Sequence, residues 1–228
     1  MLRRLIATTM AVTASASPRP IVVGLTGSIG MGKSTASKWL KSAGVKVHDA
    51  DACVHALYAP GGAAVAPVCT AFPGVEAADG GIDRAKLSAA LREPGVSIEA
   101  LNKIVHPLVK ADRDAFIERS ADAGEWLVVL DVPLLLETMD EETRQNLLSA
   151  LLVVSAPADV QRARVLSRPG MTSDKFDFIL SKQVPDATKR AAADFLIETG
   201  HESFTPARAR MRLSVASTLL IPLPQHSH

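Results

Sequence analysis

The chain has 228 residues, 47% of them hydrophobic, and a formal net charge of +1, which suits one domain with a sizeable core and insertions. Residues 1–48 contain seven Lys and Arg residues and no acidic residue, and residues 161–190 contain seven Lys and Arg residues and three acidic residues. Two such local basic segments in a nearly neutral protein favour an anionic small molecule over a nucleic acid as the binding partner. Cys53 and Cys69 lie far apart without metal-ligand spacing, which argues against a disulfide framework, and no apolar run approaches the roughly 18 residues of a membrane span.

Residues 1–20 differ in composition from the rest of the chain. They contain three arginines, are rich in Ala, Ser and Thr, and contain no acid. This composition is typical of an organellar transit peptide, and we predict a mitochondrial location. The alternative is an untargeted extension of a cytoplasmic protein. We expect the folded domain to span residues 21–219 and a tail to follow at 220–228.

A phosphate-binding loop is predicted at residues 27–35. The sequence GSIGMGKST follows the apolar strand expected at 21–26 and opens a helix that Gly44 ends. It has the spacing G-x-x-x-x-G-K-S, in which backbone N–H groups and the positive end of the helix dipole surround phosphate oxygens. The pattern places Lys33 on the β- and γ-phosphates and the Ser34 hydroxyl on Mg²⁺.

A helical region follows a second strand. That strand is expected at 45–51, ending in the carboxylates of HDAD, and a helix begins at Asp51 and ends before Pro60. Residues 63–123 contain no convincing strand. Helices are predicted there at 82–92 with Asp83 as N-cap, at 97–105, and from Pro107 to about residue 117.

The second half of the chain returns to alternating strands and helices. Strands are predicted at 125–131, 150–155 and 194–198, and helices at 157–168, at 173–183 after the N-cap Thr172, from Pro185, and at 205–217. This alternation predicts an α/β fold with a parallel five-stranded sheet flanked by helices. The expected whole is a P-loop kinase core with a helical substrate-binding insertion at about 60–123 and a helical lid at about 157–190.

Two arginines of the predicted lid lie on one helix face. Arg164 and Arg168 are four residues apart, so together they offer guanidinium groups to a transferring phosphoryl group. A solvated basic face is the alternative. A GTPase is less well supported, because NKIV at 102–105 lacks the aspartate of the guanine-recognition motif.

Several longer segments resemble the dephospho-CoA kinase family. They are HDADACVHAL after the second strand, LNKIVHPLV in the helical region, LDVPLLLE at the third strand, and the run from QRARVLSRPG to KRAAADFLI. The resemblance extends over about residues 21–200 in collinear order. It implies transfer of the γ-phosphate of ATP to the 3′-hydroxyl of the dephospho-CoA ribose, the last step in making coenzyme A.

The resemblance also implies roles for individual residues. Asp51 matches the catalytic base, Lys33 and Arg164 act on the transferring phosphate, and Asp131 orders Mg²⁺ or its waters. Asp49 is expected to organise the turn. The implied nucleotide ligands are Gly30, Met31, Gly32, Lys33, Ser34, Thr35, Arg164 and Lys189.

Two segments depart from the family pattern, and two other functions stay open. IETG at 197–200 replaces a D-N-S-G-like turn, which puts an adenine contact there in doubt, and Pro73 interrupts TAFPG. The alternatives are a nucleoside monophosphate kinase, for which the insertion is large, and an ATP-sensing binding module. We expect a monomer that binds ATP, Mg²⁺ and dephospho-CoA, with no nucleic-acid partner and no membrane insertion.

Overall fold

The computed structural model describes residues 19–200 and 212–213 and is built around one sheet. The strand order is β2-β3-β1-β4-β5-β6. Five strands run parallel, and β6 pairs antiparallel with β5. The predicted α/β architecture with five parallel strands is confirmed. The strands are β1 (Ile21–Thr26), β2 (Lys46–Asp49), β3 (Leu127–Asp131), β4 (Ala150–Ser155), β5 (Phe195–Glu198) and β6 (Arg212–Leu213).

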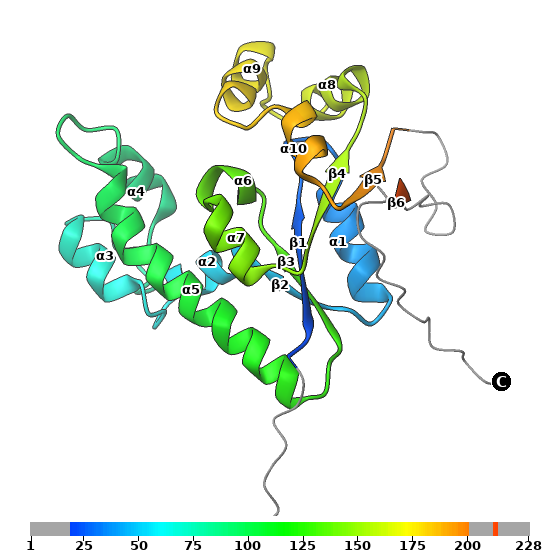
Figure 1. Cartoon of the computed structure of the whole chain (residues 1–228). Helices are drawn as coiled ribbons and strands as arrows, with labels where there is room; N and C mark the ends of the chain where they lie inside the picture. Colours follow the sequence, from blue (N-terminus) through cyan, green and yellow to red (C-terminus); the bar gives the residue numbers. More distant parts are fainter. Residues whose placement is uncertain (1–18, 201–211, 214–228) are drawn as a thin grey trace, which may run out of the picture.

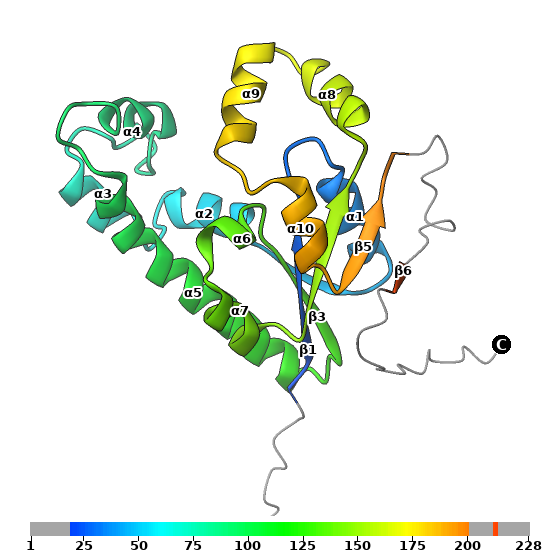
Figure 2. The same ribbon diagram turned by 45° about the horizontal axis from the view of Figure 1, so that its top comes forward.

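Helices cover both faces of the sheet (Figures 1 and 2). Alternate residues of a strand point to opposite faces, so a strand covered on both sides must be apolar throughout. In β3, Val129 packs toward α1 (Lys33–Ser42), whereas Val128 and Leu130 pack toward Phe116 and Ile117 of α5 (Ile98–Asp122). The short helices α6 (Leu135–Thr138) and α7 (Glu141–Leu147) extend the layer formed by α5.

The helical insertion has an apolar core of its own. It is formed by α2 (Ala50–Tyr58), α3 (Val65–Ala71), α4 (Arg84–Ala90) and the first half of α5. The buried members of this cluster are Tyr58, Ala64, Val68, Phe72, Val75, Ile82, Leu87, Leu101 and Val105. Asp83 caps α4 as predicted, because its Oδ1 accepts from the backbone N–H groups of Ala85 and Lys86.

A helical hairpin lies at the carboxyl end of the sheet. Figures 1 and 2 show α8 (Ala158–Leu166) and α9 (Ser173–Ser181) standing beyond the ends of β1 and β4, with α10 (Asp186–Ala192) returning to the sheet. Thr172 caps α9 as predicted, accepting from the Lys175 N–H at 3.3 Å. The hairpin corresponds to the lid expected at about 157–190.

The helix that was expected to begin at Pro107 in fact begins nine residues earlier. The single helix α5 runs from Ile98 to Asp122 and contains Pro107 in its interior, so the predicted boundary between 105 and 107 is wrong. Proline removes one helical hydrogen bond and disfavours the helix interior. Tertiary packing on both sides of Pro107 offsets this cost. Leu101 and Val105 pack in the core of the insertion, and Phe116 and Ile117 pack against the sheet.

Other boundaries also differ from the sequence-based prediction. The strand expected at 45–51 ends at Asp49, which caps α2, so Asp51 lies in the first helical turn. Helices α3, α6 and α7 were not predicted. Within the helix expected at 205–217, Arg212 and Leu213 form β6 instead, and the other residues of that range lie outside the described part of the chain. No helix in the described ranges combines the length and apolarity needed to cross a bilayer.

Candidate active site

The loop between β1 and α1 has the backbone geometry of a phosphate-binding loop. Gly30 and Gly32 have φ values of +79° and +91°, which side chains disfavour. Space is also limited: a Cβ on Gly30 would lie 2.5 Å from Val165 Cγ2, and one on Gly27 would lie 2.6 Å from the Val154 carbonyl oxygen. Gly32 is the N-cap of α1 and offers no side-chain cap, so the helix presents its first N–H groups to an anion.

The head group of Lys33 is fixed by a buried carboxylate. Lys33 Nζ lies 2.5 Å from Oδ1 of Asp131, whose side chain is 4% exposed. Asp131 ends β3, and β1 is its parallel neighbour, with Leu25 beside Asp131 in the register. The loop after β1 and the end of its parallel neighbour β3 therefore bring the predicted lysine and the predicted metal-side carboxylate together at the carboxyl end of the sheet.

Arg164 of the lid is held against the P-loop by Thr199. Its Nη1 donates to Thr199 Oγ1 at 2.7 Å and its Nη2 donates to the Thr199 carbonyl at 2.5 Å. Thr199 Oγ1 donates in turn to the Met31 carbonyl at 2.7 Å, and Thr199 is only 3% exposed. Sequence reasoning treated IETG only as a departure from the family pattern and missed this role. The available signal was a polar residue directly after a parallel strand.

Substitution of Thr199 by Val is expected to lower turnover by about 10²-fold, the cost of misplacing a catalytic group by about 1 Å. Valine keeps the shape but removes the hydroxyl that connects Arg164 to Met31. Steady-state kinetics on Thr199→Val and Thr199→Ser measure this, and the serine variant should stay near the unmodified enzyme. Near-normal turnover in Thr199→Val together with a loss in Thr199→Ser would show that the methyl group, not the hydroxyl, matters.

Two glutamines of the lid hold the backbone of the P-loop at Ile29. Gln161 Nε2 of α8 donates to the Ile29 carbonyl at 2.7 Å, and the Ile29 N–H donates to Gln183 Oε1 at 3.1 Å. Gln161 is buried. The lid and the phosphate loop are therefore joined through both backbone polar groups of one residue, a pairing across more than 130 residues that no local pattern predicts.

The two aspartates of the DAD sequence have different positions. Asp49 is the N-cap of α2, and its Oδ1 accepts from the Ala52 N–H at 3.1 Å. Its expected role in organising the turn is confirmed. Asp51 is exposed, lies in the first turn of α2 and lines the main cavity. Only Asp51 is therefore placed to meet a molecule bound there.

A cavity of about 1570 Å³ connects the P-loop with the insertion and the lid. Its lining includes seven predicted site residues: Gly30, Gly32, Lys33, Ser34, Thr35, Asp51 and Arg164. The opposite wall comes from α5, which contributes an apolar stripe of Leu101, Val105 and Val109, followed by Lys110 and Arg113. Leu101, Val105, Val109 and Arg113 are each four residues apart and so share one helix face, and Lys110 lies three residues before Arg113.

Three predicted site residues lie outside that lining. Asp131 lies behind Lys33. Met31 is buried, and its Sδ accepts a hydrogen bond from the Ala156 N–H at 3.0 Å. Its side chain is therefore not available to a nucleotide, and only its backbone groups could contact one. Lys189 is fully buried beside Glu137, with Nζ 2.8 Å from Oε1. This position does not support a nucleotide contact by Lys189. Glu137 also accepts a hydrogen bond from the Val184 N–H, and the Lys189–Glu137 pair joins α10 to α6.

An anion-binding loop alone is compatible with any nucleotide hydrolase. The cavity extends from the loop to the wall formed by α5 and so has room for an acceptor molecule beside a bound nucleotide, and together with the parallel sheet this defines the class of P-loop kinases. Residues 21–203 match the family model described as dephospho-CoA kinase. The chain belongs to the dephospho-CoA kinase family.

Relatives agree with this assignment, and a solved structure shares the fold. A dephospho-CoA kinase of Mesorhizobium japonicum is 51% identical over 191 residues, covering 84% of this chain and 93% of the relative. One of Rhizobium meliloti is 49% identical over 195 residues, covering 86% and 96%. The crystal structure of TT1252 from Thermus thermophilus has a TM-score of 0.66 and 31% identity, covering 81% and 91%.

Proposed function

We propose that this protein transfers the γ-phosphate of ATP to the 3′-hydroxyl of the dephospho-CoA ribose, giving coenzyme A and ADP. The observation that carries the proposal is the placement of Asp51 and the P-loop on one cavity, opposite the wall formed by α5. Family membership supports the substrates, and the geometry supports direct transfer between two molecules bound at the same time.

In the proposed mechanism, Asp51 orients the acceptor hydroxyl and takes its proton as the new O–P bond forms. The bond between the γ-phosphorus and the β–γ bridging oxygen breaks, and ADP leaves with that oxygen. Lys33 and Arg164 approach the phosphoryl group from the P-loop and from the lid, and they stabilise the charge on its oxygens. Thr199 holds Arg164 in register with the loop.

The residues at the predicted metal position fit Mg²⁺. Ser34 is exposed at the start of α1 and lines the cavity, and the buried Asp131 lies directly behind Lys33. A hydroxyl and a carboxylate are the hard oxygen donors that Mg²⁺ prefers beside phosphates. Bound Mg²⁺ would neutralise charge on the β- and γ-phosphates.

The wall formed by α5 has the two kinds of surface that dephospho-CoA requires. Leu101, Val105 and Val109 can pack against the apolar part of the pantetheine arm. Lys110 and Arg113 can form charged hydrogen bonds with the diphosphate of dephospho-CoA. We propose that α5 binds this part of the acceptor and thereby brings the ribose to Asp51.

Product analysis tests the proposed function. The purified chain is incubated with MgATP and either dephospho-CoA or AMP, and the products are separated and weighed by mass spectrometry. We expect dephospho-CoA to gain one phosphoryl group and AMP to remain unchanged. Conversion of AMP but not dephospho-CoA would identify a nucleoside monophosphate kinase, and binding of ATP without either product would identify a binding module.

We further propose that residues 1–20 direct import into mitochondria and take no part in catalysis. Their composition supports this, and the family match begins only at residue 21. A chain that starts at Pro20 should keep full activity in the same assay. A fluorescent protein fused after residues 1–20 should enter mitochondria, whereas the same fusion with its three arginines changed to glutamine should not. A cytosolic signal from the unmodified fusion would contradict the targeting role.

A further inference from the structure

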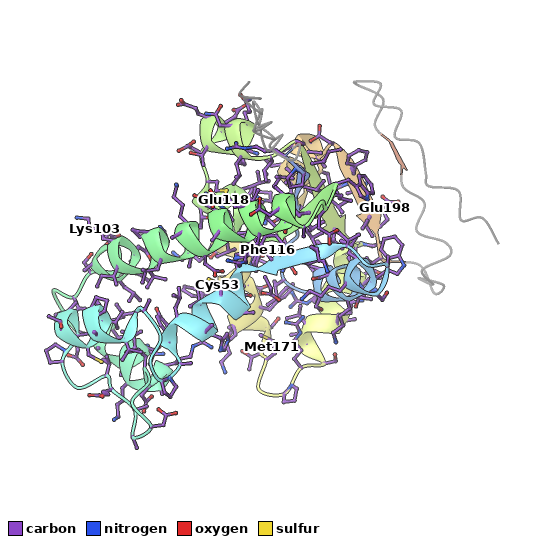
Figure 3. All side chains as sticks on the ribbon, turned by 90° about the horizontal axis from the view of Figure 1, so that it is seen from below. Cys53, Lys103, Phe116, Glu118, Met171 and Glu198 are labelled. Atoms are coloured by element: carbon purple, nitrogen blue, oxygen red, sulfur yellow. The ribbon has the colours of Figure 1, made fainter. Side chains whose placement is uncertain are left out.

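Three side chains of metal-binding types meet beside the active-site cavity. His48 lies on β2, Cys53 on α2 and Asp112 on α5, and one potential ligand atom of each lies within 4.8 Å of the others. His48 and Cys53 are 7% and 8% exposed. Figure 3 labels Cys53 on α2 and Phe116 on α5, at the side where these helices approach; the Phe116 ring packs on that of His48, with centroids 5.4 Å apart.

Without a metal, a hydrogen bond joins two members of the cluster. Asp112 Oδ2 lies 2.8 Å from His48 Nε2, and the Cys53 thiol lies within 4.8 Å of a ligand atom of each of these residues. The bond from His48 is the main cause that lowers the pKa of Asp112, although its partial burial opposes the change. Burial, reinforced by Asp112, raises the pKa of the Cys53 thiol to about 12. The thiol is therefore protonated and a poor nucleophile.

The set of donor atoms selects a particular class of cation. One sulfur, one imidazole nitrogen and one carboxylate oxygen suit Zn²⁺ and related thiophilic ions, and they do not suit Mg²⁺. Zinc binds sulfur at about 2.3 Å and nitrogen at about 2.0 Å, so the donors of a tetrahedral site lie roughly 3.5 Å apart. Donors already within 4.8 Å need only small shifts to reach that geometry.

We propose that His48, Cys53 and Asp112 bind one thiophilic divalent cation of the zinc class, and that its binding inhibits the kinase. On binding, the Sγ–metal bond forms and the thiol proton leaves to solvent. His48 binds through the Nε2 lone pair and carries its proton on Nδ1. Nδ1 is buried and has no partner among the described residues, so this tautomer is unfavourable. We therefore expect reversible binding and not a permanent structural metal.

Inhibition follows from the position of the cluster and rests on the proposed function. Asp51 lies two residues before Cys53, and His48 and Asp51 both line the cavity. A metal ion bound by residues of β2, α2 and α5 would pull these three elements together and would shift the Asp51 carboxylate relative to the acceptor hydroxyl. A displacement of about 1 Å can cost 10²-fold in rate.

Spectroscopy on the full chain tests binding independently of activity. Cd²⁺ serves as the probe, because its bond to a thiolate gives an ultraviolet charge-transfer band. Cys69, half-buried on α3, is the matched control for Cys53. We expect one Cd²⁺ per chain, with Zn²⁺ as a competitor. Cys53→Ser should remove the band and weaken binding by at least the 10–100-fold typical of losing a supporting partner. Cys69→Ser should change neither.

A second pair of variants keeps the test decisive if Cys53→Ser fails to fold. Asp112→Asn should weaken Cd²⁺ binding, whereas Asp114→Asn, which alters a half-buried carboxylate paired with Lys110 and Arg113, should not. The absence of a band, or a band that depends equally on Cys69, would overturn the proposal and leave a hydrogen-bonded cluster only.

The proposed inhibition by the bound metal is tested by kinase assays at buffered concentrations of free Zn²⁺ with Mg²⁺ in excess. Zn²⁺ should inhibit the unmodified and Cys69→Ser enzymes, and Cys53→Ser should resist it. Equal inhibition of all three would overturn the inhibitory role. Normal Cd²⁺ binding by a protein that does not phosphorylate dephospho-CoA would refute the proposed function and leave the metal site standing.

Discussion

Lys33→Ala is expected to lower turnover by about 10³-fold or more, since charged groups that act on the transferring phosphoryl contribute roughly 10³–10⁵-fold. Lys33 lies at the N-terminus of α1, where the loop glycines leave space for phosphate, and its Nζ is 2.5 Å from Asp131. Alanine removes this charge while leaving the loop backbone in place. Single-turnover kinetics with MgATP and dephospho-CoA measure the effect on the chemical step.

The same substitution leaves the buried Asp131 without its cation. Leaving a buried polar group unpaired costs about 1–3 kcal/mol, so Lys33→Ala should also unfold at a lower denaturant concentration. Lys38→Ala, an exposed position on the same helix, is the control for general effects on α1. Near-normal turnover in Lys33→Ala, with the fold intact, would contradict the assignment of the phosphate loop.

Asp51→Asn is expected to lower turnover by about 10²–10⁴-fold, the usual contribution of a general base. Asparagine keeps the shape and the ability to orient a hydroxyl, but it cannot accept the proton. Dephospho-CoA should bind with nearly unchanged affinity, because α5 supplies most of the proposed acceptor contacts. Titration calorimetry for binding and rapid-quench kinetics for transfer separate the two effects.

Asp49→Asn is the matched control two residues away. Asp49 caps α2 by accepting from the Ala52 N–H, and asparagine is an equally good N-cap, so this change should cost little. If Asp49→Asn instead impairs transfer more than Asp51→Asn, with both variants folded, the wrong carboxylate has been assigned as the base.

Local signals in the sequence were sufficient for the five parallel strands and the phosphate loop, although not for β6. The glycine spacing at 27–35 and the apolar runs of β1, β3 and β4 arise from requirements within a few residues: backbone freedom at Gly30 and Gly32, and burial of both strand faces. Caps such as Asp83 and Thr172 are equally local and were predicted correctly.

The features that could not be predicted depend on contacts between distant segments. Packing at both ends of α5 overrides the local signal of Pro107. Lys189 carries a charge that suggests a phosphate ligand, and only the folded structure shows it buried against Glu137. Thr199 directly follows a parallel strand, which is a local signal, but its partner Arg164 lies 35 residues earlier in the chain and no local pattern pairs the two.

Tracing the transferred phosphate distinguishes direct transfer to the ribose from hydrolysis and from transfer to another hydroxyl. The protein is incubated with Mg²⁺, dephospho-CoA and ATP labelled in the γ-phosphate, and the product is examined by phosphorus NMR. We expect the label to appear as a phosphomonoester on the ribose 3′-oxygen of coenzyme A, and we expect this signal to be lost in Lys33→Ala. Label found only in inorganic phosphate, or on another hydroxyl, would contradict direct transfer to an acceptor held between the P-loop and α5.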